Sequence, residues 1–116
     1  MKNAVEFAGA WVAAWNRRDV EAVLDHFHDD AVFSSPVAQL IGFSESGVVR
    51  GKEELRRYWT VALAGNPDLH FDITGVFEGI DMIAIAFRTQ AGVDRLEILS
   101  FAGGLVAEGR GTFAVT

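Results

Sequence analysis

The sequence predicts a single α+β domain, with three helices in its first part and a mainly antiparallel sheet in its second. Apolar residues recur at helical spacing in three segments before residue 66 and then alternate with a period of two up to residue 113. Glu-Gly, Ala-Gly and Gly-Gly pairs separate the alternating runs, as hairpin turns would. Helices followed by strands indicate an α+β fold. A chain of 116 residues suffices for about one domain with one core, so residues 1–116 are assigned to it.

The three helices are marked by their apolar faces and end signals. The first is expected from Lys2 to Arg17, with an apolar face of Val5, Ala8, Trp11, Val12 and Trp15. The second is expected to follow an N-cap at Asp19 and to end near His28. The third is expected to open at Gly51 and to stop at Gly65. Its inward residues are expected to be Leu55, Trp59, Ala62 and Leu63.

The sheet is expected to contain five strands. The first is "AVFSS", residues 31–35, which includes Phe33 and ends before Pro36. The others form a meander: Leu69–Phe77, Met82–Thr89, Val93–Phe101 and Leu105–Phe113. Three helices on one face of a strongly curved, mainly antiparallel sheet make a cone, which leaves an internal apolar pocket lined by Trp and Phe.

The segment from Pro36 to Arg50 has no clear period, yet it carries the apolar residues Leu40, Ile41 and Phe43. Its glycines permit hinge motion. We therefore expect a mobile flap whose apolar residues touch the ligand or the surface of the third helix.

Composition excludes several classes of function. The net charge of −6 opposes binding to nucleic acid, and no apolar run reaches the roughly 18 to 20 residues that a membrane span needs. Without cysteine there is no disulfide and no thiolate nucleophile. We expect a cytoplasmic protein that needs no cofactor. The pairs His26/His28 and Asp29/Asp30 invite a metal site, but their spacing matches no metal motif, so a solvated helix end is favoured and no metal is expected.

Three stretches, "WNRRDVEAVLDHFHDDAVFSSPV", "GKEELRRYW" and "EILSFAGGLVAEGRGTF", resemble the SnoaL-like branch of the nuclear transport factor 2-like (NTF2-like) superfamily. The resemblance covers nearly the whole chain and implies the cone fold with its internal pocket. It does not imply one activity, because the superfamily includes ketosteroid isomerases, limonene epoxide hydrolases, polyketide cyclases, scytalone dehydratases and binders without catalysis.

The resemblance implies two sets of catalytic residues, those of the ketosteroid isomerases and those of the epoxide hydrolases, and both are incomplete in this chain. The isomerase base, an aspartate before the proline that ends the first strand, is Ser35 here, and the isomerase tyrosine on the first helix falls at Trp11. The second hydrogen-bond donor of the isomerases falls at Glu97, which retains the acid. In the epoxide hydrolase triad, the two aspartates fall at Gln90 and Gly111. Neither mechanism is therefore supported.

Glu97 is the strongest candidate for chemistry. In "DRLEIL" it alternates onto one sheet face with Arg95, Leu99 and Phe101. If that face is concave, Glu97 stands in a pocket whose expected ligand-binding residues are Trp11, Trp15, Phe33, Ser35, Trp59, Leu99 and Phe101. Burial would raise the pKa of Glu97 and suit it to act as an acid or hydrogen-bond donor. The alternative is a partly exposed acid paired with an arginine across the sheet.

Two functions remain open. The first is a pocket protein that binds a small hydrophobic molecule without chemistry and forms a homodimer through apolar residues on the outer sheet face. The second is an enzyme of isomerase, cyclase or hydrolase type on a small carbonyl or polyketide-like substrate, with Glu97 as acid or hydrogen-bond donor. Ser35 is expected to hydrogen-bond a ligand or water and not to act as a nucleophile, because no histidine is placed to activate it. The alternative is that Ser34 and Ser35 only satisfy backbone groups at the strand end.

Overall fold

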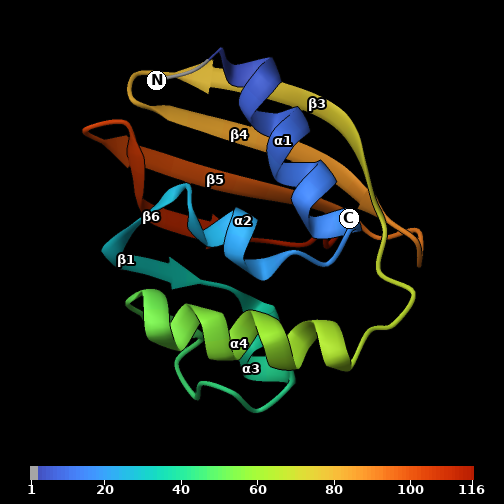
Figure 1. Ribbon diagram of the computed structural model, residues 1–116. Coiled ribbons are helices and arrows are strands. Elements are labelled where there is room, and N and C mark those ends of the chain that lie inside the picture. The colour runs from blue at the N-terminus through green and yellow to red at the C-terminus, as the bar shows by residue number, and fades with distance from the viewer. Residues whose placement is uncertain (1–2) are drawn as a thin grey trace.

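A strongly curved six-stranded sheet wraps around the core and is covered by helices on its concave face (Figure 1). The structure is a computed structural model and describes residues 3–116. The helices are α1 (Ala4–Asn16), α2 (Val20–Leu24), α3 (Pro36–Leu40) and α4 (Lys52–Ala64). The strands are β1 (Phe27–Ser34), β2 (Val48–Arg50), β3 (Phe71–Gly79), β4 (Met82–Thr89), β5 (Asp94–Ala102) and β6 (Leu105–Gly111). This α+β arrangement confirms the predicted fold class.

The strand order is β2-β1-β6-β5-β4-β3. Strands β3 to β6 form the predicted antiparallel meander, and β1 pairs parallel to β6. Alternation in β4 places Ile83, Ile85 and Phe87 on the concave face, where each is at most 1% exposed. In Figure 1, α1 crosses the β3 side of the sheet and α4 lies on the β1 side. A cavity lies between these two helices and the concave face.

Helix α1 begins at the N-cap Asn3, whose side-chain oxygen accepts from the backbone N–H of Val5 at 2.9 Å. The predicted start at Lys2 lies outside the described residues. Helix α4 runs from Lys52 to Ala64, as predicted from its apolar face. No helix in residues 3–116 is long and apolar enough to cross a membrane.

The second helix is shorter than predicted, and the first strand is longer. Helix α2 ends at Leu24, and β1 already begins at Phe27 because it pairs with Val106 of β6. The backbone N–H of Val106 donates to the carbonyl of His26 at 2.8 Å. A long-range backbone pairing therefore ends the helix, and the helical spacing of Phe27 gave a wrong boundary.

The segment from Pro36 to Arg50 is not the aperiodic flap predicted. It contains α3 and the edge strand β2, which pairs antiparallel to β1. Ser35 caps α3 and Pro36 occupies its first turn, where a missing N–H costs nothing. The segment is also tied to the strand end, since the backbone N–H of Ser35 donates to the carbonyl of Gly47 at 2.9 Å. Its mobility stays a prediction.

Candidate functional site

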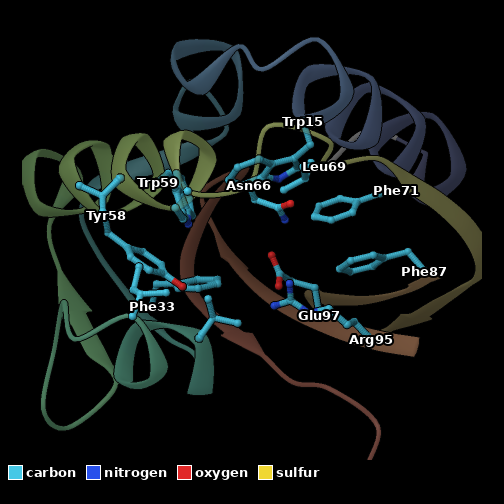
Figure 2. A pocket seen from close by; sticks show the side chains of 15 residues that line it. Trp15, Phe33, Tyr58, Trp59, Asn66, Leu69, Phe71, Phe87, Arg95 and Glu97 are labelled. Atoms are coloured by element: carbon cyan, nitrogen blue, oxygen red, sulfur yellow. The ribbon is translucent and has the colours of Figure 1, made fainter. Parts of the chain in front are cut away.

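A cavity of about 420 Å³ lies between α4, the end of α1 and the concave face of the sheet. Its walls are mostly apolar, and its aromatic lining includes Trp15, Phe33, Trp59, Phe71 and Phe87. Figure 2 shows Tyr58 and Trp59 reaching in from α4 on one side and Phe71 and Phe87 facing them from the other, with the carboxyl of Glu97 between. A small molecule with an apolar body fits a hollow of this size and lining.

Four of the eight predicted site residues line this cavity: Trp15, Phe33, Trp59 and Glu97. The other four do not. Trp11 is 1% exposed and lies behind the wall, with its ring 5.3 Å from that of Phe87. Leu99 is fully buried, and Phe101 contacts Phe7 of α1 at a ring distance of 5.2 Å, near the opposite end of the sheet.

Glu97 provides the carboxyl group of the cavity. It is 5% exposed, and burial raises its pKa to about 7, although the charge of Arg95 lowers it. Among residues 3–116, no hydrogen bond to this carboxyl is found. A buried acid without a hydrogen-bond partner, facing a cavity, is available to a ligand.

Arg95 stands beside Glu97 in the cavity wall. Its Nε donates to the carbonyl of Thr112 at 3.1 Å, and its guanidinium carbon lies 5.5 Å from the centre of the Phe87 ring. These contacts fix the side chain on the concave face. The predicted alternative, an exposed acid paired with an arginine, is therefore wrong for Glu97, which is buried and only electrostatically influenced by Arg95.

The side chain of Ser35 is hydrogen-bonded to the backbone. Its Oγ accepts from the backbone N–H of Val37 at 3.1 Å, so it caps α3, as the alternative interpretation expected. Ser35 is 3% exposed and is not part of the cavity lining. Its hydroxyl lies near that of Tyr58, which does line the cavity, and lowers the Tyr58 pKa.

Tyr58 is the main site residue that the sequence did not single out. Burial raises its pKa, and the nearby hydroxyl of Ser35 opposes this effect. The charged residues around it in "KEELRRYW" are typical of a solvated helix face. The available signal was spacing, because Tyr58 follows the buried Leu55 by three positions and shares its face.

The α3 segment forms part of the cavity wall. Val37 and Ile41 line the cavity, and the ring of Phe43 lies 5.4 Å from that of Tyr58 on α4. These contacts agree with the predicted roles of Ile41 and Phe43. Leu40 is 75% exposed and points to solvent, so its predicted contact is wrong in this arrangement.

The opposite rim is held by hydrogen bonds. Asn66 lines the cavity, and its Oδ1 accepts from Nε2 of Gln90 at 3.0 Å. The guanidinium of Arg18 donates to the carbonyls of Leu63 and Asn66. Arg18 follows the C-cap of α1 and has a positive φ of 63°, the left-handed conformation that commonly ends a helix. The rim after α4 is therefore fixed by two side chains from elsewhere in the chain.

No group of three or more potential metal ligands occurs within residues 3–116. His26 and His28 flank the first residue of β1, so the predicted helix end around them is wrong. Nε2 of His28 is hydrogen-bonded to the carbonyl of Ala102, and the ring of His26 lies 4.7 Å from that of Phe7. Both histidines therefore have structural contacts.

Comparison with known proteins decides the family. The model of the SnoaL-like domain matches residues 8–114. The protein belongs to the SnoaL-like family. A solved SnoaL-like protein of unknown function from Burkholderia thailandensis is 37% identical, with a TM-score of 0.89 over 96% of this chain and 93% of the other. No curated protein matches this SnoaL-like chain.

More distant solved structures agree in fold. An NTF2-like protein of unknown function from Burkholderia pseudomallei is 15% identical, with a TM-score of 0.78 over 98% of this chain and 92% of the other. A ketosteroid isomerase-like fold from Catenulispora acidiphila, in complex with trimethylamine, is 16% identical, with a TM-score of 0.76 over 97% of this chain and 88% of the other. The SnoaL-like chain thus has the NTF2-like cone fold that its sequence predicted.

Proposed function

We propose that this SnoaL-like protein binds a small, mainly apolar molecule whose polar group is held by Glu97. The observation that carries this proposal is the Glu97 carboxyl, which is 95% buried, lacks a hydrogen-bond partner among residues 3–116 and faces an aromatic cavity of about 420 Å³. An unpaired buried carboxyl costs stability, and a ligand group that hydrogen-bonds it removes this cost. A protein of similar fold was solved in complex with trimethylamine, so this type of fold can hold a small molecule.

Titration with naphthalene and 2-naphthol tests this function, because the pair differs by one hydroxyl. Trp15 and Trp59 line the cavity, so their fluorescence reports binding. We expect the wild type to bind 2-naphthol about five- to tenfold more tightly than naphthalene, the effect of about 1 kcal/mol from one hydrogen bond. Glu97→Leu should abolish this preference and still bind naphthalene. Failure of both compounds to change tryptophan fluorescence or to stabilise the fold would contradict the proposal.

A catalytic role for Glu97 is the second candidate. The observation that favours it is the pKa of about 7, which leaves both the acid and the base form of Glu97 present near neutral pH. Substrates of this kind would be small carbonyl or polyketide-like molecules, protonated or hydrogen-bonded by Glu97. Turnover of such a molecule that follows the ionisation of Glu97 and disappears in Glu97→Gln would establish catalysis over binding alone.

We also propose that the protein forms a homodimer through the outer face of the sheet. Leu96 and Ile98 of β5 lie there, paired with Ala86 and Ala84 of β4, and all four are partly exposed. A second copy of the same face matches this apolar patch, and polar or nucleic-acid surfaces do not. We expect a dimer in sedimentation at micromolar concentration.

Ile98→Glu should convert this dimer to a monomer, because it places a charge in the patch. The matched control is Ile80→Glu in the β3–β4 turn, where Ile80 is already 92% exposed. A wild-type monomer with no concentration dependence would refute the proposed dimer.

A further inference from the structure

Tyr58 has a hydrogen-bonding capacity that its known contacts do not use. The residue is 3% exposed and lines the cavity, and its hydroxyl is close enough to that of Ser35 for the Ser35 hydroxyl to lower the Tyr58 pKa. A tyrosine hydroxyl has one donor and two acceptor positions. Whichever of the two hydroxyls donates in the Ser35 pair, Tyr58 retains either its own O–H or a lone pair for another group. Burial raises the pKa of Tyr58, so the phenol keeps its proton near neutral pH.

Ser35 is placed to fix the position of that hydroxyl. Its Oγ is already held by the backbone N–H of Val37 at the start of α3. The Tyr58 ring is held by neighbouring rings, with the centroid of Phe43 at 5.4 Å and that of Phe33 at 6.4 Å. The phenol therefore has little freedom to turn away from the cavity.

Gly111 brings this hydroxyl pair next to the acid. A Cβ added at Gly111 would lie 3.1 Å from both Oε1 of Glu97 and Oγ of Ser35. The glycine thus leaves the space in which the Glu97 carboxyl and the Ser35–Tyr58 pair approach each other from β5 and from the α3–α4 side. Figure 2 shows the side chains of Tyr58 and Glu97 both in the cavity, whose remaining lining is mainly apolar apart from Arg95 and Asn66.

One ligand ring can reach both groups if its polar atoms are adjacent. We propose that the natural ligand is an aromatic molecule with oxygen substituents on two neighbouring ring carbons, one hydrogen-bonded to Glu97 and the other to Tyr58, and that Ser35 is the positioning residue for Tyr58. The inference rests on the proposed function, because it adds a second contact to the one made by Glu97. A second oxygen gives Tyr58 a hydrogen-bond partner of its own while the first oxygen stays on Glu97.

The test compares 2-naphthol with 2,3-dihydroxynaphthalene, which adds one adjacent hydroxyl to the same rings. Titrations under nitrogen, followed by tryptophan fluorescence, should give about fivefold tighter binding of the diol to the wild type. Tyr58→Phe keeps the ring and should remove this gain, so that 2-naphthol and the diol bind the variant with equal affinity. Thr60→Val is the matched control, because it removes a hydroxyl from the exposed side of the same helix.

Ser35→Ala separates positioning from simple structural support. A positioning role predicts a smaller ratio between the affinities for the diol and for 2-naphthol, whereas loss of the α3 cap alone would change both affinities together and leave their ratio as in the wild type. Equal affinities for 2-naphthol and the diol in the wild type would overturn the inference and leave the proposed function intact. A diol gain that persists in Tyr58→Phe would also overturn it. Loss of 2-naphthol binding itself would instead refute the proposed function.

Discussion

Replacing Trp11 with alanine is expected to lower the free energy of unfolding by about 3–5 kcal/mol, the range for large aromatic residues in well-packed cores. Trp11 is 1% exposed, and its ring lies 5.3 Å from Phe87 and 6.1 Å from Phe71 and stacks on the latter. Phe71 and Phe87 line the cavity in front of Trp11. Their movement into the space that Trp11 leaves should also weaken binding of naphthalene. Chemical denaturation monitored by circular dichroism measures the first effect.

Trp11→Phe is the control for this substitution. The indole Nε1 of Trp11 is buried and has no hydrogen-bond partner among residues 3–116, so its loss removes no hydrogen bond. We expect Trp11→Phe to lower the free energy of unfolding clearly less than Trp11→Ala does, because most of the apolar volume remains. If Ala and Phe cost the same, the stability would depend on the indole N–H and the packing account would be wrong.

The free energy of unfolding should fall by about 3 kcal/mol between pH 4.5 and pH 7 because of Glu97. Its pKa is about 7 in the folded protein and ordinarily 4.5, so the folded state holds this proton more tightly than the unfolded chain. The stabilisation is therefore fully present below pH 4.5 and is lost as the pH rises through 7. Denaturation of the wild type and of Glu97→Gln across this range measures the difference.

In Glu97→Gln this part of the pH dependence should be absent, since glutamine does not ionise. Other titrating groups affect both proteins equally and cancel in the difference between them. The free energy of unfolding of Glu97→Gln is therefore expected to rise relative to that of the wild type as the pH rises. Two parallel stability curves would mean that Glu97 ionises as an exposed acid does, and would remove the main support for a ligand at this carboxyl.

The sequence predicted most helices and strands because their apolar residues follow the period of the element they form. It failed where backbone pairing between distant segments decided the outcome. Phe27 fits the apolar face of a helix, yet it lies in β1 because β6 pairs with it. Helix α3 has only five residues, too few to show a period, and its signals were the Ser35 cap and Pro36.

The sequence predicted which face of the sheet carries the candidate site, but not how far the cavity extends along that face. Alternation along β5 correctly placed Arg95, Glu97, Leu99 and Phe101 on the concave side. Parity does not tell how far along the strand the cavity extends, so Leu99 and Phe101 were assigned to it although they lie beyond it. Tyr58 was not predicted because its sequence neighbours are charged, although it shares the buried helix face of Leu55.

The parallel pairing of β1 with β6 sets the order in which the site is completed during synthesis. Phe33 lies on β1 and Glu97 on β5, and β6 joins these two strands. A nascent chain that has not yet released residues 105–111 from the ribosome has only β2 as a partner for β1. Contacts of such long sequence separation form late and slow the folding of a domain. The two walls of the cavity are therefore joined only when β6 emerges, and the unpaired strand edges of that interval favour aggregation.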